Sequence, residues 1–341
     1  MRKKLIGWIA CVFILVCLLF IVSIFSLCVG SVGISAKKII SLIFEGRHNS
    51  TEYNILFNIR LPRILLGFAI GGGLSLAGVI MQGLFRNPLV EPYTLGISGG
   101  AALGVCLNIV LRLNYRLGLL SLPICGFLGA VSVIALVYTL SRRKGILKTH
   151  DLLLAGVMIS FLCSSLVMLI MAIGRTEDLH GIIFWIMGSL EEPNWFLIKL
   201  TVFISILGLF VSYLFCIDLN ALSIGEEEAV HLGINVERTK LALFLLASLL
   251  TGCSVSVAGV IGFVGLTIPH LVRMVVGKDY RIALIASFLI GGAFLILCDT
   301  LARIIISPLE LPVGVITGIL GGSLFVYVLA KGRDVLTQNL H

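Results

Sequence analysis

The residue types that carry out covalent or metal chemistry are scattered through this sequence and form no catalytic group. Nine cysteines lie inside apolar segments, with no Cys-x-x-Cys pair and no histidine at ligand spacing. The sequence contains no His-Glu-x-x-His motif and no Gly-x-x-x-x-Gly-Lys-Ser/Thr loop of the kind that binds ATP phosphates. We therefore interpret the cysteines as small packing residues and expect no catalytic residue, metal site or cofactor in this chain.

Basic residues offer the clearest candidate chemistry. Arg60 and Arg63 flank Pro62 in the sequence Ile-Arg-Leu-Pro-Arg, directly before a long apolar run. A guanidinium group is planar and can pair with a carboxylate through two parallel hydrogen bonds. What these arginines can bind depends on the side of a membrane on which they lie, because basic residues usually mark the cytoplasmic side.

Composition places most of the chain inside a membrane. Of the 341 residues, 59% are hydrophobic and only 12% are charged, and the mean hydropathy is +1.13. A transmembrane helix needs about 20 apolar residues, and the loops between the apolar runs are too short for a soluble domain. We predict an all-α polytopic membrane protein with one transmembrane domain over residues 1–341. The predicted spans are 5–29, 64–84, 93–111, 118–140, 151–173, 195–217, 241–261, 263–276, 282–300 and 312–330.

The seventh and eighth spans decide the topology. As one helix rising about 1.5 Å per residue, residues 241–276 would reach about 54 Å, so the chain must turn back near Gly259, Gly262 or Gly265. With ten spans and both termini inside, 15 of the 25 lysines and arginines are cytoplasmic, whereas nine spans leave 10 there. The net charge of +8 therefore reflects topology, and we expect no nucleic-acid partner. The same topology places Arg60 and Arg63 outside.

An internal repeat supports the ten-span count. Residues 74–90 and 255–272 share the pattern Ser-x-Ala-Gly-Val-Ile, and a proline follows ten residues after the shared glycine in each. The paired positions are Gly78 with Gly259 and Pro88 with Pro269. The ten-span topology gives the copies opposite orientation, so we predict inverted halves at about 60–175 and 240–330, helices 2–5 and 7–10. The alternative is chance similarity between small-residue helix contacts.

Four motifs in order resemble a known family. The stretches IRLPR…GGGLSLAGVIMQGLFRNPLVEPYTLGISGGA, LNALSIGEEEAVHLG, AGVIGFVGLTIPHLVR and CDTLARIIISPLELPVGVITGILGGSLFVYVL are similar to the membrane subunits of ABC importers for iron-siderophores, haem and cobalamin. The resemblance covers about residues 50–330. It implies the ten-helix fold of the cobalamin-importer permease, in the bacterial cytoplasmic membrane.

The resemblance also implies partners and a substrate class. The expected partners are ATP-binding subunits on the cytoplasmic side, an extracytoplasmic substrate-binding protein, and a second permease, either identical or similar. Iron-siderophores are the commonest substrates of such importers, with cobalamin, haem and molybdate as alternatives. A transporter driven by protons or sodium is the main rival class. Such transporters usually carry carboxylates in mid-membrane, whereas the acidic residues here, Asp299 included, lie at span ends or in loops.

The polar loop at 218–240 is the candidate contact with the ATPase. Gly225 can open a short helix at 226–232, whose acidic residues lie at its N-terminal end, where the helix dipole favours them. Gly233 can close it in the left-handed conformation, and a second short helix is expected at 234–240. A solvated connector is the alternative. The residues that the resemblance assigns to coupling are Gly225, Glu226, Ala229, Leu232 and Gly233.

The resemblance assigns two further sites. Arg60, Arg63 and Arg303 would bind glutamates of the binding protein at the outer surface, and the alternative is anchoring to lipid phosphates. Thr149 and His150 would form the inner gate of a path along the dimer interface, beside the fifth and tenth spans. Small or polar residues that could line this path, or serve as close helix contacts, are Gly156, Ser160, Ser164, Ser165, Gly314, Thr317, Gly318 and Gly321.

Two proline motifs predict irregular helix ends. A proline disfavours the helical conformation of the residue before it, so spans should end or break near Asn87, before Pro88, and near Ile268, before Pro269. Asn87 and His270 could then bind the freed backbone groups. For His270 we favour such capping over metal binding or proton transfer, because no second ligand accompanies it.

Overall fold

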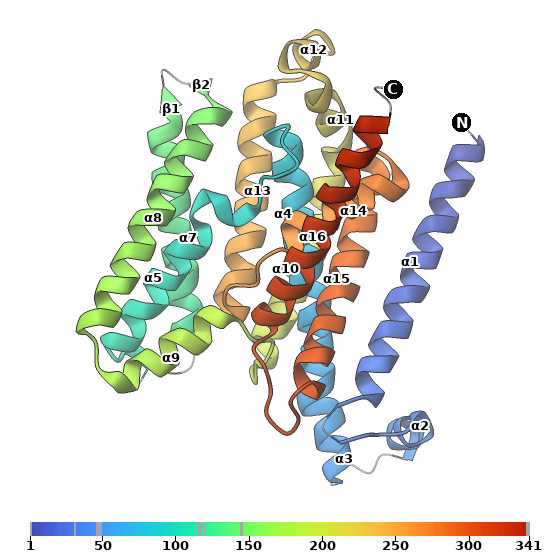
Figure 1. Cartoon of the computed structure of the whole chain (residues 1–341), viewed down its shortest axis with the longest axis vertical. Helices are drawn as coiled ribbons and strands as arrows, with labels where there is room; N and C mark the ends of the chain where they lie inside the picture. The colour runs from blue at the N-terminus through green and yellow to red at the C-terminus, as the bar shows by residue number, and fades with distance from the viewer. Residues whose placement is uncertain are drawn as a thin grey trace.

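The computed structural model describes residues 2–30, 32–45, 50–114, 118, 120–143 and 146–338. Within these residues the chain is a bundle of helices, as predicted, with one short hairpin (Figure 1). Its first half comprises α1 (Arg2–Cys28), α2 (Ala36–Glu45), α3 (Thr51–Asn54), the π-helical turn η1 (Ile55–Arg60), α4 (Leu61–Leu84), the 3-10 turn η2 (Pro92–Leu95), α5 (Ile97–Val110), α7 (Ser121–Ser141), β1 (Arg142–Arg143), β2 (Ile146–Leu147) and α8 (Thr149–Ile173). Its second half comprises α9 (Thr176–Met187), α10 (Trp195–Leu214), α11 (Cys216–Ile224), α12 (Glu226–His231), α13 (Val236–Ala258), α14 (Val264–Val276), α15 (Tyr280–Ile304) and α16 (Val313–Gln338).

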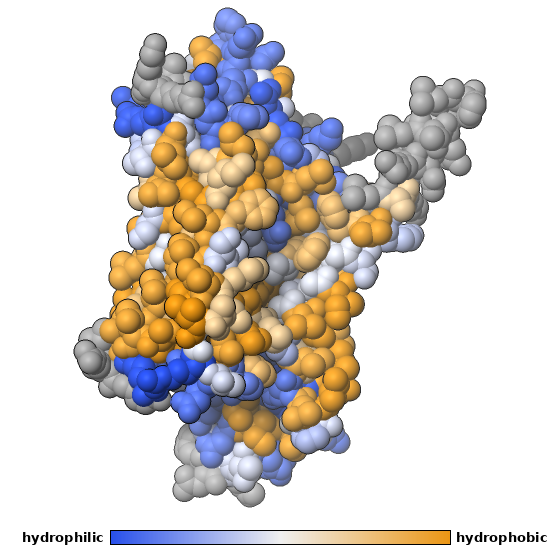
Figure 2. Space-filling view, turned by 60° about the vertical axis from the view of Figure 1, so that its left-hand side comes forward, coloured by the Kyte–Doolittle hydropathy of each residue, from blue (hydrophilic) through white to orange (hydrophobic). Residues whose placement is uncertain are grey.

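Each of the ten predicted spans coincides with a helix. Among the described residues, seven helical segments are long and apolar enough to cross a membrane. Two shorter apolar helices, Ile97–Val110 and Val264–Val276, lie where the third and eighth spans are predicted, and the apolar part of α16, Val313–Val328, lies where the tenth is. Figure 2 shows a belt of apolar side chains between two polar ends, as a bilayer requires of a protein that spans it.

The two ends of the bundle carry different elements. The start of α1, the end of α16, α12 and the β1–β2 hairpin lie at one end, and α2, α3 and α9 lie at the other (Figure 1). We call these the α12 end and the α9 end. An even number of spans brings the start of the first and the end of the last to the same side, so this arrangement agrees with ten.

The apolar stretch at 241–276 turns back where a glycine permits it. α13 ends at Ala258, and Gly259 follows with a φ of 72°, a left-handed conformation that glycine adopts without steric cost. A Cβ at Gly259 would also collide with the carbonyl oxygen of Trp185. The chain stays non-helical until α14 begins at Val264. The predicted turn is therefore confirmed at Gly259.

The lengths of the helices support two inverted halves. α4, α5, α7 and α8 have 24, 14, 21 and 25 residues, and α13, α14, α15 and α16 have 23, 13, 25 and 26. In Figure 1, α4 runs toward the α12 end and α13 runs away from it. The short matching sequences themselves differ in structure, because Gly78 lies within α4 whereas Gly259 follows the last residue of α13.

The core is built around α4, which contacts α10, α13, α14 and α15. Small residues allow close approach, because a Cβ at Gly71 would meet the backbone carbonyl of Gly291 in α15. α1 is peripheral: it packs mainly along α15 and exposes apolar side chains such as Phe13 and Phe20. These exposed side chains suit contact with lipid tails.

The predicted break near Ile268 is wrong. Pro269 lies inside α14, although it lacks the N–H that would bind the carbonyl of Gly265 four residues earlier. The Nε2 of Gln82, in α4, donates instead to the carbonyl oxygens of Gly265 and Leu266, at 3.2 Å each. A side chain from a neighbouring helix thus satisfies the freed carbonyl, and α14 continues.

The other proline motif behaves as predicted. α4 ends at Leu84, before Pro88, and Arg86 has a φ of 49°, so the helix cannot continue through it. The Oδ1 of Asn87 accepts a hydrogen bond from the N–H of Leu89 at 2.9 Å. Asn87 therefore binds a freed backbone group after the helix end.

Three further local features differ from the sequence analysis. The expected short helix at 234–240 is the first part of the long helix α13, which begins at Val236. The polar loop is shorter than predicted, since Asp218 lies within α11. The β1–β2 hairpin, which pairs Arg142 with Leu147, and the half-length helix α9 were not predicted.

Candidate functional site

The three arginines predicted at the outer surface lie together at the α9 end, but their side chains are buried. Arg60 is 2% exposed, Arg63 is 5% exposed and Arg303 is 3% exposed. Their burial was not predicted, because the sequence analysis placed them outside without foreseeing partners within the chain. We call these three residues and Asp299, which is 4% exposed, the outer arginine cluster. The binding of a partner protein by this cluster stays a prediction.

Arg63 connects two loops of the α9 end to α15. Its Nη1 lies 2.7 Å from Glu310, in the loop before α16, and 3.8 Å from Asp299 of α15. Its Nη2 lies 3.4 Å from Glu191, in the loop between α9 and α10. Glu191 and Glu310 are 76% and 41% exposed, so these acidic groups, rather than the arginine, face solvent.

Arg303 and Arg60 hold the end of α1 against the bundle. The Nε of Arg303 donates to Asp299 Oδ2 at 3.0 Å, and its Nη2 donates to Ser26 Oγ at 2.9 Å. Arg60 donates to the backbone carbonyl oxygens of Leu27 and Val32, around the C-terminal end of α1. Cationic groups stabilise a helix at this end, where carbonyl groups lack partners. All three arginines are thus compensated within the chain.

Only part of this network was visible in the sequence. Asp299 and Arg303 are four residues apart, which places both on one face of a helix. Ser26, Glu191 and Glu310 come from distant segments, and the sequence gives no sign that they meet the cluster. The network therefore depends on the tertiary fold.

The candidate coupling segment forms a compact projection at the α12 end. Gly225 precedes α12, and Gly233 follows it with a φ of 83°, both as predicted. Ala229 is fully buried against the bundle, whereas Leu232 is 67% exposed. Glu226 pairs with Lys240, the buried lysine of α13. Ala229 and Glu226 therefore position the projection, and Leu232 is available to a partner.

The sequence analysis missed two exposed apolar residues on the same projection. Ile224, the last residue of α11, is 69% exposed, and Val230, within α12, is 59% exposed. Together with Leu232 they place an apolar surface at the polar α12 end of the molecule. Large exposed apolar side chains that gather in this way indicate a contact surface for another protein.

The predicted gate residues begin α8. Thr149 and His150 follow the β1–β2 hairpin after Lys148, at the α12 end, and the side chain of His150 is 88% exposed. Its Nδ1 lies 3.9 Å from the carboxylate of Asp151. The gate role itself stays a prediction.

Several residues predicted to line a path are instead close contacts within the chain. A Cβ at Gly156 would lie 2.6 Å from the Cα of Leu95, and a Cβ at Gly321 would lie 2.6 Å from the Cβ of Phe263. Gly314 likewise has the carbonyl of Met187 against it, and Thr317 is buried. The residues that remain accessible are Ser164 and Ser165 on α8, which are exposed, and Gly318 on α16, with open space beside it.

An unpredicted contact joins the segment that precedes α5, which includes the 3-10 turn η2, to the segment that precedes α14. The hydroxyl of Tyr93, before α5, donates to the carbonyl of Ile261 at 3.0 Å and accepts from its N–H at 3.2 Å. The carboxylate of Glu91 accepts from the N–H of Phe263 at 2.9 Å. Phe263 has a φ of 68° and packs against Gly321 of α16. The two halves are therefore hydrogen-bonded to each other through the segments before α5 and α14, and this contact lies beside α16.

His270 has a role different from the predicted capping. Its ring lies 5.9 Å from that of Phe325 in α16, in an edge-to-face arrangement. The cap that Pro269 requires comes from Gln82. His270 also lines a cleft at the α12 end together with Arg273.

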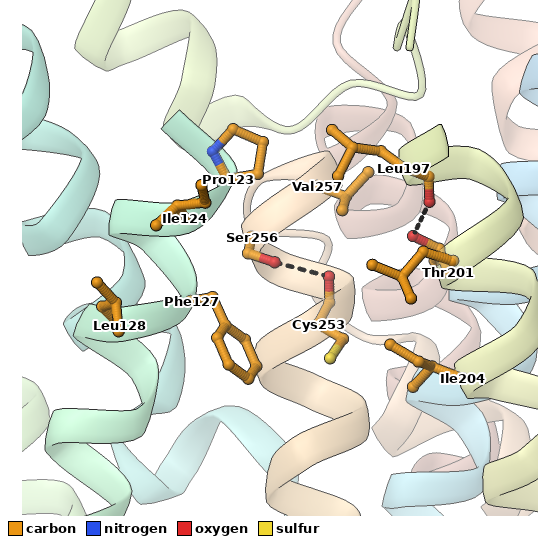
Figure 3. A pocket seen from close by; sticks show the side chains of 11 residues that line it. Pro123, Ile124, Phe127, Leu128, Leu197, Thr201, Ile204, Cys253, Ser256 and Val257 are labelled. Atoms are coloured by element: carbon orange, nitrogen blue, oxygen red, sulfur yellow. Dashed lines mark hydrogen bonds between the residues drawn. The ribbon is translucent and has the colours of Figure 1, made fainter. Parts of the chain in front are cut away.

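An apolar cavity of about 270 Å³ lies between α7, α10 and α13 (Figure 3). The hydroxyls in its wall bind their own helices: Thr201 donates to the carbonyl of Leu197 at 2.8 Å, and Ser256 to that of Cys253 at 2.9 Å. No charged side chain lines it. The cavity is therefore unsuited to a charged ligand.

Comparison with known proteins identifies relatives over nearly the whole chain. Residues 18–331 match the FecCD transport family. The hemin transport system permease protein HmuU of Yersinia pestis is 39% identical over 322 residues, covering 94% of this chain and 95% of that protein. The Fe(3+) dicitrate transport system permease protein FecD of Escherichia coli (strain K12) is 36% identical over 296 residues, covering 86% and 90%. A solved structure described as an inward-facing conformation of a metal-chelate type ABC transporter matches with a TM-score of 0.84 at 34% identity, covering 94% of this chain and 98% of that chain.

Proposed function

Because the chain belongs to the FecCD transport family of ABC permeases, we propose that it is the membrane subunit of an importer for an iron chelate. Separate ATP-binding subunits power the transport, and an external binding protein delivers the substrate. The multi-pass chain lies in the inner membrane, with both termini and the α12 end in the cytoplasm. ATP is bound by the partner, so this chain needs no cofactor of its own.

The apolar projection at the α12 end carries the proposal. Val230 in α12 and Ile224 and Leu232 on either side of it are exposed. Buried Ala229 and the pair of Glu226 with Lys240 hold α12 in place. A rigid projection with an apolar surface can enter a groove of an ATPase subunit and transmit its movement to α13. Glycines at 225 and 233 set the two ends of α12.

The transport path lies between two permease copies in this proposal. Exposed Ser164 and Ser165 on α8 and the open side of Gly318 on α16 supply small or polar groups to that path. Thr149 and His150 close its cytoplasmic end. The second copy is either this chain or a similar permease.

The substrate class rests on the relatives. HmuU is named for hemin and FecD for Fe(3+) dicitrate, and both cargoes are iron complexes. An iron chelate such as a ferric siderophore is accordingly the proposed cargo. Uptake of iron-siderophore, hemin, cobalamin and molybdate by the reconstituted importer, each delivered by the cognate binding protein, would distinguish these candidates.

The experiment that tests the transport proposal measures energy coupling. The permease is reconstituted in liposomes with its ATPase, and uptake is followed with ATP inside, without ATP, and with a protonophore. We expect uptake to require ATP and to survive the protonophore. Uptake that is abolished by the protonophore and independent of ATP would support an ion-driven transporter instead.

A matched pair of variants tests the coupling surface. Leu232→Asp should prevent co-purification of the ATPase, because it places a charge in an apolar contact. Leu309→Asp is the control, since Leu309 is 70% exposed in the loop before α16 at the opposite end. Equal ATPase recovery with both variants would show that Leu232 does not contact the ATPase.

A further inference from the structure

A cleft of about 510 Å³ opens at the α12 end, beside the ends of α4, α11 and α14 and the start of α15. Arg86, Arg273 and Lys278 line it, together with His270 and Tyr280. Among the described residues that line it there is no aspartate or glutamate. Three cationic side chains therefore share one cavity without an acidic group in its wall.

The described residues outside the cleft supply no counter-ion to these three cations either. In the part of the chain that the structure describes, none of them forms an ion pair with a carboxylate. Arg273 is half-buried and donates one hydrogen bond, from Nη2 to Gln82 Oε1. A guanidinium has five N–H donors, and a partly desolvated cation is costly unless an acceptor or an anion compensates it. Arg273 thus presents unused donors and an unbalanced charge to the cleft.

The nearest acidic residue in the sequence is already engaged elsewhere. The Oδ2 of Asp279 lies 3.4 Å from the ammonium of Lys4, and its Oδ1 accepts from Asn220 at 3.2 Å and from the N–H of Arg281 at 3.1 Å. Burial alone would raise the pKa of Asp279, but these hydrogen bonds and Lys4 outweigh burial and lower the pKa. Asp279 therefore stays ionised with Lys4 and does not neutralise the cleft.

Apolar side chains adjoin the cleft. Met274 lines it and is 63% exposed, Val275 is 85% exposed, and Leu89, next to Pro88 of the lining, is 54% exposed. Trp8 lies near the same level, because the Lys4 that pairs with Asp279 also lies 4.9 Å from the centre of its ring. Tryptophan and lysine are typical of the membrane–water interface. The cleft therefore lies where a lipid can reach both cations and apolar surface.

We propose that this cleft binds the phosphate group of an anionic membrane lipid, with Arg86, Arg273 and Lys278 around the phosphate and the acyl chains along Met274 and Val275. Arginine and lysine are the side chains that bind phosphate, and basic pockets between helices on the cytoplasmic side bind anionic head groups. The assignment of the cleft to the cytoplasmic leaflet rests on the proposed function. The positive charge of the cleft is independent of that function.

The test uses the full-length permease alone, delipidated in detergent. Phosphatidylglycerol should raise its Tm and remain bound in native mass spectrometry, whereas phosphatidylcholine should do neither. The double variant Arg86→Gln with Lys278→Gln should weaken phosphatidylglycerol binding by about tenfold or more. Arg281→Gln with Lys148→Gln removes the same charge from exposed positions outside the cleft and should leave binding unchanged.

Other outcomes would overturn the proposal in distinct ways. Equal weakening by both double variants, or equal binding of phosphatidylcholine, would show that there is no such site. An equal rise in Tm with inorganic phosphate would support a phosphate site and overturn its assignment to a lipid. Unchanged lipid binding with loss of ATPase co-purification would assign the cations to a protein partner. Because the lipid assay needs neither ATPase nor substrate, its failure would leave the transport proposal untouched.

Discussion

At the α9 end of the molecule the chain supplies a partner to every buried arginine that we describe there. At the α12 end, by contrast, no carboxylate among the described residues pairs with Arg273. Arg63 and Arg303 share Asp299, and Arg60 binds backbone carbonyls at the end of α1. In the described part of the chain Arg273 binds only an amide oxygen, and Arg86 and Lys278 add further positive charge beside it.

The difference separates structural charges from charges that await a ligand. Removing a cation from water costs free energy, and a fold can recover that cost only through acceptors close at hand. Where the chain provides them, as at the outer arginine cluster, the charges hold segments together. Where it does not, an external anion stabilises the site, and the variants below test this contrast.

The largest effect is expected when the outer arginine cluster loses its buried acid. Asp299→Ala leaves Arg303 and part of Arg63 uncompensated, and breaking a buried ion pair in this way costs about 3–5 kcal/mol. Arg273→Gln breaks no ion pair and loses one hydrogen bond from a charged group, so it should cost less, about 1.5 kcal/mol. Thermal unfolding in detergent measures both. Equal losses would remove the distinction between the two ends.

A smaller and local effect is expected at α1. Arg60→Met removes the hydrogen bonds to the carbonyls of Leu27 and Val32, and bonds from a charged group are worth about 1.5–3 kcal/mol. Hydrogen exchange should therefore accelerate at residues 26–34, while α4 and α15 remain protected. Uniform acceleration across the bundle would mean that Arg60 supports the core rather than the end of α1.

The spans and the coupling segment were predictable because they depend on local sequence. The lengths of the apolar runs determine how many helices can cross the bilayer. A backbone position with a left-handed conformation favours glycine, as at Gly259 and Gly233. The burial of the arginines was not predictable, because Glu191 and Glu310 come from distant loops. The positive-inside rule counts the charges in loops and treats each of them as exposed, so it could not predict this burial.

One wrong prediction and one unpredicted contact have the same origin. Pro269 remains inside α14 because Gln82, on another helix, binds the carbonyl that the proline frees. The acidic residues were predicted to lie at span ends or in loops, and Glu91 does lie in a loop. That loop, however, folds into the bundle and binds the N–H of Phe263. In each case a partner from elsewhere in the fold changes what a local pattern means.

Lys240 shows that the presence of a paired carboxylate, rather than the end of the molecule at which a cation lies, decides whether its charge is compensated. It lies at the α12 end, is 5% exposed and is paired with Glu226, so it belongs with the compensated charges. Glu226→Gln should destabilise α12 by about 1 kcal/mol, because Glu226 is itself partly exposed. Hydrogen exchange of α12 measures this. Glu227→Gln, one residue on and exposed, is the control and should change little.

The smallest effect on stability is expected at Glu191. A variant at this residue also tests the prediction that the outer arginine cluster binds a partner protein. Glu191 is 76% exposed and 3.4 Å from Arg63, and such pairs contribute about 0–1 kcal/mol, so Glu191→Gln should leave the Tm nearly unchanged. If Arg63 exchanges its own carboxylates for those of a binding protein, removing this competitor should tighten docking, and added salt should reduce the gain. The Kd for the cognate binding protein measures this, with Glu192→Gln as the neighbouring control. Unchanged docking would mean that Arg63 serves the fold alone, and weaker docking would make Glu191 itself the contact.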